Sequence, residues 1–255
     1  MELGTNEFAD LSLQEFIDLK LSKFNMSEIT DDLFTQHQPD NNQTSSSTSS
    51  SESSESSSLS PSSSSYNSNT SRCISSNCGL GKEKKNLSEQ NFVDCQTFGN
   101  KGCEGGCAHN AYHQVLKGHG VSHSNMYPYV GYKNTAICSA VGLTINIRSY
   151  AMTLGRKEFG LTKALLDTPV SASFDASSRE FQLYVRGIFS SPTCDKLKPS
   201  HSVLVTGYQP GAWLIKNSFG VNWGEAGFFR LARNTDDKCG IASFASYPEF
   251  NGVIP

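Results

Sequence analysis

The sequence lacks the features that would point to a nucleic acid, a membrane or a metal ion. Its 255 residues carry a formal net charge of -3 at pH 7, so they offer no basic field to a polyanion. No apolar run approaches the length of a membrane-spanning helix. The eight cysteines contain no paired Cys-x-x-Cys units of the zinc-binding type. We therefore expect no nucleic acid, no membrane, no metal and no cofactor among the binding partners.

A secretory signal is missing as well. The chain begins Met1-Glu-Leu-Gly-Thr5, with no charged region followed by an apolar region. An even number of cysteines without zinc-type spacing nevertheless favours disulfides, and disulfides imply an oxidising compartment. The cysteines and the N-terminus thus disagree about localisation, and we expect that the chain has lost its beginning, as a fragment, through an alternative start or through an imperfect gene model.

A serine-rich stretch divides the chain. From Asn41 to Ser71 more than half of the residues are serine and most of the others are Asn, Thr or Glu, a composition too polar to repay the entropy of ordering. We predict a disordered linker at residues 41–71. Four Asn-x-Ser/Thr sequons, which matter only if the protein is secreted, begin at Asn25, Asn42, Asn69 and Asn86.

Helix and strand signals lie on both sides of this stretch. Ser12 and Glu15 form a capping box that opens a short helix, and Ser88 opens another. Apolar residues at helical spacing predict a helix over Asn110–Lys117, ended by Gly118. One further helix is predicted at Lys157–Leu166, and strands are predicted at Val170–Phe174, Phe181–Phe189, Val203–Tyr208, Trp213–Lys216 and Gly227–Ala232.

The stretch Trp213–Arg230 places a polar residue, Asn217, at the end of an apolar strand. An asparagine amide can bond one ring nitrogen of a nearby histidine while the other nitrogen serves a nucleophile. His201 begins the apolar strand that precedes this stretch, so we predict that His201 and Asn217 face each other across neighbouring strands. Either residue alone would equally fit a buried polar residue of the core.

These residues, together with Leu87–Cys95 and Gly102-Cys-Glu-Gly-Gly106, resemble the papain-like cysteine proteases, in particular the cathepsin L branch. The resemblance implies an α+β fold of two domains: a helical left-hand domain, incomplete here, and a right-hand antiparallel β domain of barrel-like form. It implies a remnant of an inhibitory propeptide at residues 1–40, the linker at 41–71, and a papain-like peptidase domain that lacks the nucleophile segment at 72–255.

The family pattern fails just before Ser88. Family members carry Cys-Gly-Ser-Cys-Trp, whose second cysteine is the nucleophile and begins a long buried helix. If Cys78-Gly79 corresponds to the first Cys-Gly, Gly81 stands where the nucleophile belongs and no tryptophan follows. The stretch from Cys73 to Ser88 is too short for that helix and its return loop. The resemblance therefore implies that the nucleophile and the oxyanion-hole donors are missing.

Other positions of the site survive in part. By resemblance, His201 is the proton carrier and Asn217 holds its ring, whereas Ser200 and Phe219 stand where the family has aspartate and tryptophan. The substrate-binding positions that the resemblance implies are Gly105, Gly106, Ser173 and Ser202, the two glycines as an extended backbone wall and the two serines as the lining of a pocket. Two buried small residues would give the same serine pattern.

Disulfides also follow from the resemblance. The implied pairs are Cys95–Cys138, Cys194–Cys239 and Cys78–Cys103. This leaves Cys73 and Cys107, which either pair with each other or stay free.

The function implied is that of a papain-family cysteine endopeptidase, made as a zymogen and directed to a lysosome or vacuole or secreted. As written, the chain is predicted to be inactive because no catalytic cysteine is identifiable. Alternatively, it is a non-catalytic homologue in which Gly4–Phe16 or the remnant of the cleft captures an active relative and inhibits it. The expected partners are peptide or protein substrates or related cysteine proteases, and we expect a monomer.

Overall fold

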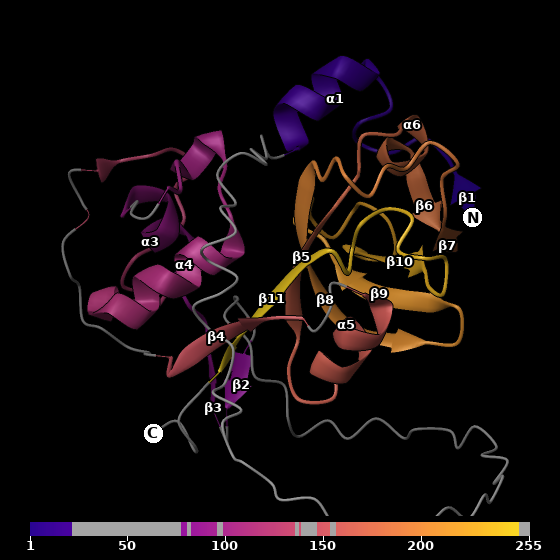
Figure 1. Ribbon diagram of the computed structural model, residues 1–255. Coiled ribbons are helices and arrows are strands. Elements are labelled where there is room, and N and C mark those ends of the chain that lie inside the picture. The colour runs from indigo at the N-terminus through magenta and orange to yellow at the C-terminus, as the bar shows by residue number, and fades with distance from the viewer. Residues whose placement is uncertain are drawn as a thin grey trace, which may run out of the picture.

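A computed structural model describes residues 1–21, 78–80, 83–95, 99–135, 138, 147–153 and 157–249 of the chain. The described residues form a smaller, mainly helical lobe and a larger lobe that contains most of the strands (Figure 1). The predicted linker at 41–71, Cys73, Gly81 and the sequons at Asn25, Asn42 and Asn69 lie outside the described residues. None of the described helices is both long and apolar enough to cross a membrane.

A seven-stranded sheet in the order β4-β11-β5-β8-β9-β10-β7 dominates the described residues. All neighbours are antiparallel except β10 and β7, which are parallel. The strands are β4 (Ser149–Met152), β5 (Val170–Phe174), β7 (Ile188–Phe189), β8 (His201–Gln209), β9 (Ala212–Lys216), β10 (Phe228–Ala232) and β11 (Phe244–Glu249).

Alternation of side chains explains the central strands. Along β8, Val203 and Val205 are buried while Leu204 between them is only half-buried, and the same pattern continues in β9 and β10. The buried sides join one aromatic core that includes Trp213, Trp223 and Phe229. Two short helices lie beside this sheet, α5 (Glu158–Ala164) and α6 (Arg179–Gln182), and α6 leads directly into β6 (Tyr184–Arg186).

The helical lobe has a small core of its own. Its elements are α3 (Glu89–Asp94), the 3-10 helix η2 (Gly102–Glu104), α4 (Ala108–Gln114) and the π-helical turn η3 (Val115–His119), and the hairpin of β2 (Cys78–Leu80) and β3 (Glu83–Lys85) lies below them in Figure 1. Tyr112 and Val115 are buried in this core. The Tyr112 hydroxyl donates to Ser171 Oγ at 2.8 Å, which ties α4 to the large sheet.

The N-terminal residues pack on the strand lobe. Strand β1 (Glu2–Leu3) pairs antiparallel with β6, and helix α1 (Leu13–Lys20) follows. Ser12 caps α1, and its side chain and that of Glu15 form the reciprocal bonds of a capping box, as predicted. Phe16 of α1 is fully buried in the main core.

Most predicted elements of the strand lobe are present, with shifts of one or two residues at their ends. The strand predicted at Phe181–Phe189 is wrong in its first part, because Ser178 caps α6 and Phe181 lies in that helix. The remainder forms β6 and β7, separated at Gly187. Strands β1, β4 and β11 were not predicted from the sequence.

Candidate active site

His201 and Asn217 occupy the same end of two neighbouring strands. His201 is the first residue of β8, and the preceding Ser200 N–H donates to the Phe174 carbonyl of β5 at 2.9 Å. Asn217 directly follows β9, and its N–H donates to the Gly227 carbonyl at 2.9 Å. Sheet hydrogen bonds on both sides therefore fix the backbone that carries each side chain.

The two side chains are joined by a buried hydrogen bond. His201 Nε2 lies 2.8 Å from Asn217 Oδ1, and the Ser218 N–H also donates to that oxygen at 2.8 Å. Because a backbone N–H can only donate, the Asn217 atom is an acceptor, and His201 Nε2 must carry the proton. In the neutral ring, Nδ1 then holds a free lone pair, which is the protonation state of a base.

Aromatic side chains enclose the His201 ring. Phe219 is tilted over it with ring centroids 4.9 Å apart, and Phe174 and Phe181 lie at 6.2 and 6.4 Å. Only 4% of the His201 surface is exposed. This burial lowers the pKa of His201 to about 4, although the hydrogen bond to Asn217 acts in the opposite direction. The imidazole is therefore neutral at neutral pH.

Neither remaining polar atom of the pair is hydrogen-bonded within the described part of the chain. His201 Nδ1 and Asn217 Nδ2 are both buried without a partner there. A catalytic thiol would be expected to meet Nδ1. The backbone of Cys78, the candidate from the sequence for the cysteine before the nucleophile, belongs to the β2–β3 hairpin, where it is in register with Lys85.

The predicted pocket serines are neighbours in the sheet. Ser173 of β5 and Ser202 of β8 are in register, and their Oγ atoms lie 2.9 Å apart. Phe244 of β11 is in register with Ser173 on its other side, so the three residues share one face of the sheet. Phe244 was not singled out from the sequence, because its strand was not predicted.

The predicted glycine wall follows η2. Gly105 has φ 111°, accepts from the Lys101 N–H at 2.9 Å and donates to the Gly102 carbonyl at 3.1 Å. The Asn100 side chain packs so closely on Gly106 that a Cβ there would clash with it. Asn100 also bonds both the N–H and the carbonyl of Cys107. The Asn100 side chain thus fixes the backbone of Gly106 and Cys107.

Among the described residues, Cys95–Cys138 and Cys194–Cys239 form disulfides, and both are pairs that the resemblance implied. The third implied pair, Cys78–Cys103, is not formed, because Cys103 carries a free and exposed thiol. Its intended partner belongs to the β2–β3 hairpin, and Cys103 belongs to the separate helical turn η2.

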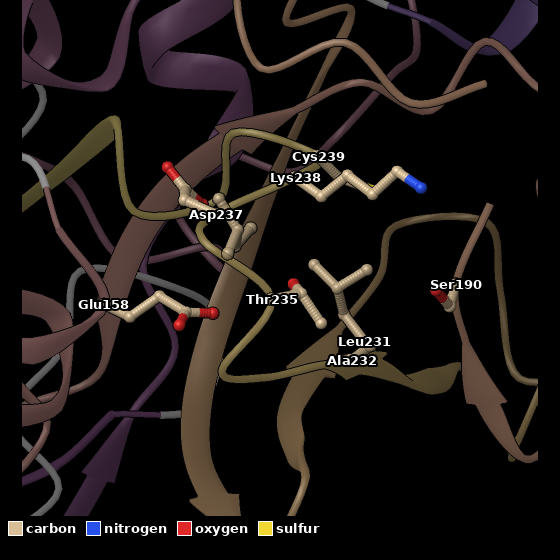
Figure 2. A pocket seen from close by; sticks show the side chains of 9 residues that line it. Glu158, Ser190, Leu231, Ala232, Thr235, Asp237, Lys238 and Cys239 are labelled. Atoms are coloured by element: carbon tan, nitrogen blue, oxygen red, sulfur yellow. The ribbon is translucent and has the colours of Figure 1, made fainter. Parts of the chain in front are cut away.

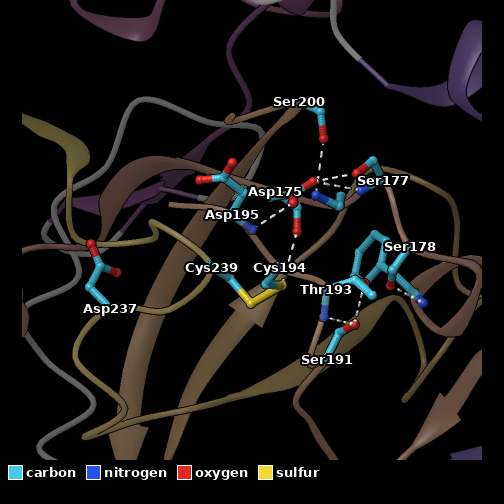
Figure 3. Close-up of a disulfide and its surroundings, with 12 residues drawn as sticks. Asp175, Ser177, Ser178, Ser191, Thr193, Cys194, Asp195, Ser200, Asp237 and Cys239 are labelled. Atoms are coloured by element: carbon cyan, nitrogen blue, oxygen red, sulfur yellow. Dashed lines mark hydrogen bonds between the residues drawn. A yellow bond between two sulfur atoms is a disulfide. The ribbon is translucent and has the colours of Figure 1, made fainter. Parts of the chain in front are cut away.

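The second disulfide stabilises the loop that leads to His201. Figure 3 shows the Cys194–Cys239 bond beneath Asp175, the residue that follows β5. The Asp175 carboxylate accepts from the Asp195 N–H at 2.9 Å and from Ser177, and the Asp175 N–H donates to the Cys239 carbonyl at 2.9 Å. The loop before His201 is therefore tied to the end of β5 and to the Cys239 loop.

A pocket at the opposite end of β10 contains none of the predicted catalytic or substrate-binding residues. Its lining includes the polar residues Glu158, Thr235, Asp237 and Lys238 and the apolar residues Leu231 and Ile241, and Figure 2 shows Glu158 and Thr235 to the side of Leu231. Burial raises the pKa of Asp237, but its carboxylate already accepts from the Ala242 N–H and the Ser243 hydroxyl. This pocket is better explained as part of the loop structure. Within the described ranges, no three or more His, Cys, Asp or Glu residues are grouped to hold a metal ion.

Comparison with known proteins agrees with this arrangement. The family model for papain family cysteine protease matches residues 56–249. The chain is 39% identical over 169 residues to cathepsin L of Sarcophaga peregrina, covering 64% of this chain and 50% of that protein. It is 39% identical over 174 residues to zingipain-2 of Zingiber officinale, covering 66% of this chain and 77% of the relative.

The solved structure of digestive procathepsin L2 proteinase from the larval midgut of Tenebrio molitor has the same fold. It superposes with a TM-score of 0.61 at 33% identity, over 66% of this chain and 54% of that one. The predicted α+β fold of this type is thereby confirmed. The chain spans about half the length of the cathepsin L and the procathepsin L2 that it matches.

Proposed function

The chain belongs to the papain family of cysteine proteases, and we propose that it carries the proton-transfer half of a peptidase site without the nucleophile. As written, it is then unable to hydrolyse peptides. The observation that supports this most strongly is the pair of His201 and Asn217, which is hydrogen-bonded at 2.8 Å while His201 Nδ1 is buried with no partner among the described residues.

The chemistry of such a site needs an imidazole and a thiol together. A thiolate attacks the peptide carbonyl, and the imidazolium beside it protonates the leaving amine. Asn217 would hold the His201 ring with Nδ1 directed to the sulfur. Without that sulfur, the buried imidazole has no thiolate to stabilise its protonated form, in keeping with its lowered pKa. The pair is preserved but has nothing to activate.

The substrate contacts would be those of an extended peptide. Gly105 and Gly106 would provide the backbone wall, and Ser173 and Ser202 would line a pocket. The two serine hydroxyls bond each other at 2.9 Å, and because only one of them donates in that bond, the other keeps a proton that it can donate to a ligand. We infer that peptides or proteins are the ligands of this cleft and that the protein is a monomer of the lysosome, vacuole or extracellular space.

Turnover of a fluorogenic dipeptide substrate tests this proposal. Purified chain should release no fluorophore above buffer, because loss of the thiolate removes the reaction. An active cathepsin L-like enzyme at equal concentration serves as the positive control, and the His201→Gln variant serves as the matched negative control. Turnover that depends on His201 would overturn the proposal, since a nucleophile would then have to exist in this chain.

A second function, capture and inhibition of an active relative, is favoured by one specific feature. Residues 1–21 fold onto a strand lobe of the type found in papain-family proteases, so this segment is complementary to such a surface. Titration of the chain into an active cathepsin L-like enzyme tests it. Inhibition should rise with concentration and should weaken when Phe8, a buried residue of the segment, is replaced by alanine. An unchanged rate at large excess of the chain would exclude this function.

A further inference from the structure

The N-terminal segment, residues 1–21, is held on the strand lobe by buried polar contacts. Gln182 of α6 is fully buried, and its side-chain amide donates to the carbonyls of Phe8 at 2.7 Å and Leu11 at 3.0 Å. The Asn6 amide donates in turn to the Gln182 carbonyl at 2.8 Å. Arg179 binds the Leu11 carbonyl at 2.7 Å from outside. Because these are bonds to the backbone, the path of the segment over the lobe is fixed.

Two phenylalanines of this segment meet one ring of the candidate active site. Phe8 is 4% exposed and Phe16 is fully buried. Both rings lie edge-on to Phe219, at 5.5 and 5.8 Å between centroids. On its other sides Phe219 contacts the His201 imidazole at 4.9 Å, Trp223 at 5.3 Å and Phe181 at 6.2 Å between ring centroids. Phe219 therefore connects the N-terminal segment with the imidazole.

From this arrangement we propose that the N-terminal segment acts on His201 through Phe219. Phe8 and Phe16 hold the Phe219 ring over the imidazole and so exclude water from it, which makes both residues positioning residues for His201. The segment thus controls the access of water to the proton carrier, His201, and this effect is separate from any blocking of the substrate-binding site. The proposal rests on the proposed function only in taking His201 as the proton carrier.

The N-terminal segment does not act on His201 through a change in nearby charge. The imidazole is faced by Phe174, Phe181, Phe219 and Asn217, all neutral. The elements packed around these side chains carry several charged residues: Asp175 after β5, Arg179 and Glu180 of α6, Lys216 of β9, Arg230 of β10 with its partner Glu225, and Glu15, Asp18 and Lys20 of α1. The causes of the lowered pKa of His201 are burial and the Asn217 bond, with no contribution from these charges. Access of water is therefore what the segment controls.

Nuclear magnetic resonance titration of the histidine rings tests the proposal in the full chain. The signal of His201 is identified by its absence from the His201→Gln spectrum. In Phe8→Ala the midpoint of the His201 titration should rise by about one pH unit or more, because water reaches the imidazole once one of the rings that support Phe219 is lost. Phe8→Leu retains apolar volume without the flat ring and should show a smaller rise. Leu19→Ala is the matched control, since Leu19 belongs to the same segment and is 66% exposed.

The outcomes distinguish a failure of the coupling between the N-terminal segment and His201 from a failure of the proposed function. An unchanged His201 midpoint in Phe8→Ala and Phe8→Leu, with the fluorescence of the buried Trp213 and Trp223 unaltered, would overturn the coupling and leave the proposed function intact. If Phe8→Ala fails to fold, Phe8→Leu decides. Turnover by the unchanged chain would overturn the proposed function without affecting the coupling, because the titration requires no catalysis.

Discussion

The burial of His201 predicts how the stability of the protein depends on pH. The ordinary pKa of histidine is 6.5, and burial lowers that of His201 to about 4. Between these values the unfolded chain binds a proton that the folded chain does not, so the free energy of unfolding should fall as the pH falls from about 6.5 to about 4. The loss attributable to this residue is on the order of 3 kcal/mol.

Urea unfolding at a series of pH values measures this effect in the unchanged chain and in His201→Gln. His109, whose pKa is also lowered by burial, contributes in the same direction in both proteins, so the difference between the two curves isolates His201. The curve of the variant should be flatter between pH 4 and 6.5. Parallel curves would mean that His201 is accessible to water in the folded protein.

The sequence predicts where His201 and Asn217 lie in the fold, but it does not predict which groups surround their side chains. The positions of His201 and Asn217 at strand ends follow from the apolar runs beside them, and the structure joins the two side chains at 2.8 Å. The proton on Nε2 requires the Ser218 N–H, which a pattern of residues does not reveal. The contact of Phe8 with Phe219 joins residues more than two hundred positions apart and depends on the folded chain.

Among the elements, the turn between β9 and β10 gives a prediction about glycine. Gly224 has φ 61°, and an added Cβ would lie 2.6 Å from the Phe228 carbonyl oxygen. Gly211, between β8 and β9, has φ 78° with open space around it. Gly211→Ala should cost only the left-handed backbone penalty, about 1–2 kcal/mol. Gly224→Ala should cost at least about 2 kcal/mol more, because the backbone must also shift.

Thermal unfolding of the two glycine variants provides the comparison. Both residues have positive φ, so the backbone penalty is shared and the difference in midpoint reports the steric contact alone. Equal midpoints for Gly211→Ala and Gly224→Ala would show that the turn around Gly224 is loose.

Elements that were missed or misassigned depend on tertiary contacts. Phe181 has a strand-like neighbourhood in sequence, yet Ser178 caps a helical turn that buries the Phe181 ring under Trp223. Strand β11 contains Pro248, which argues against a strand in a sheet interior. The proline is tolerated because β11 pairs with β5 only as far as Ser246 and beyond it with β4 alone.

For the whole molecule, the Cys194–Cys239 disulfide should be a major source of stability. It links residues 45 positions apart, and a loop of that length is expected to contribute about 2–4 kcal/mol. The double variant Cys194→Ala, Cys239→Ala should lose that amount in urea unfolding. Cys103→Ala, which removes an exposed free thiol, is the control and should leave the midpoint unchanged. Equal midpoints for the two variants would contradict the anchoring of the loop before His201.

The two lobes differ in how completely the sequence specifies them. In the strand lobe, alternating apolar residues and glycines at turns predict the strands, and most of the predicted strands are present. The helical lobe was predicted to be incomplete from the short stretch before Ser88, and its described helices are α3, η2, α4 and η3. Pairing of Cys78 with Cys103 was predicted from the resemblance alone and is not formed, since a disulfide depends on the positions of both partners.

The central claim, an imidazole–amide pair without a sulfur to activate, is tested most directly by intact mass spectrometry after treatment with a thiol-directed epoxide probe. An active papain-family protease under the same conditions should gain the mass of one probe. This chain should gain no mass that depends on His201, so that any slow labelling of the exposed Cys103 persists in His201→Gln. Rapid addition of one probe to Cys73 or Cys78, abolished in His201→Gln, would contradict the account.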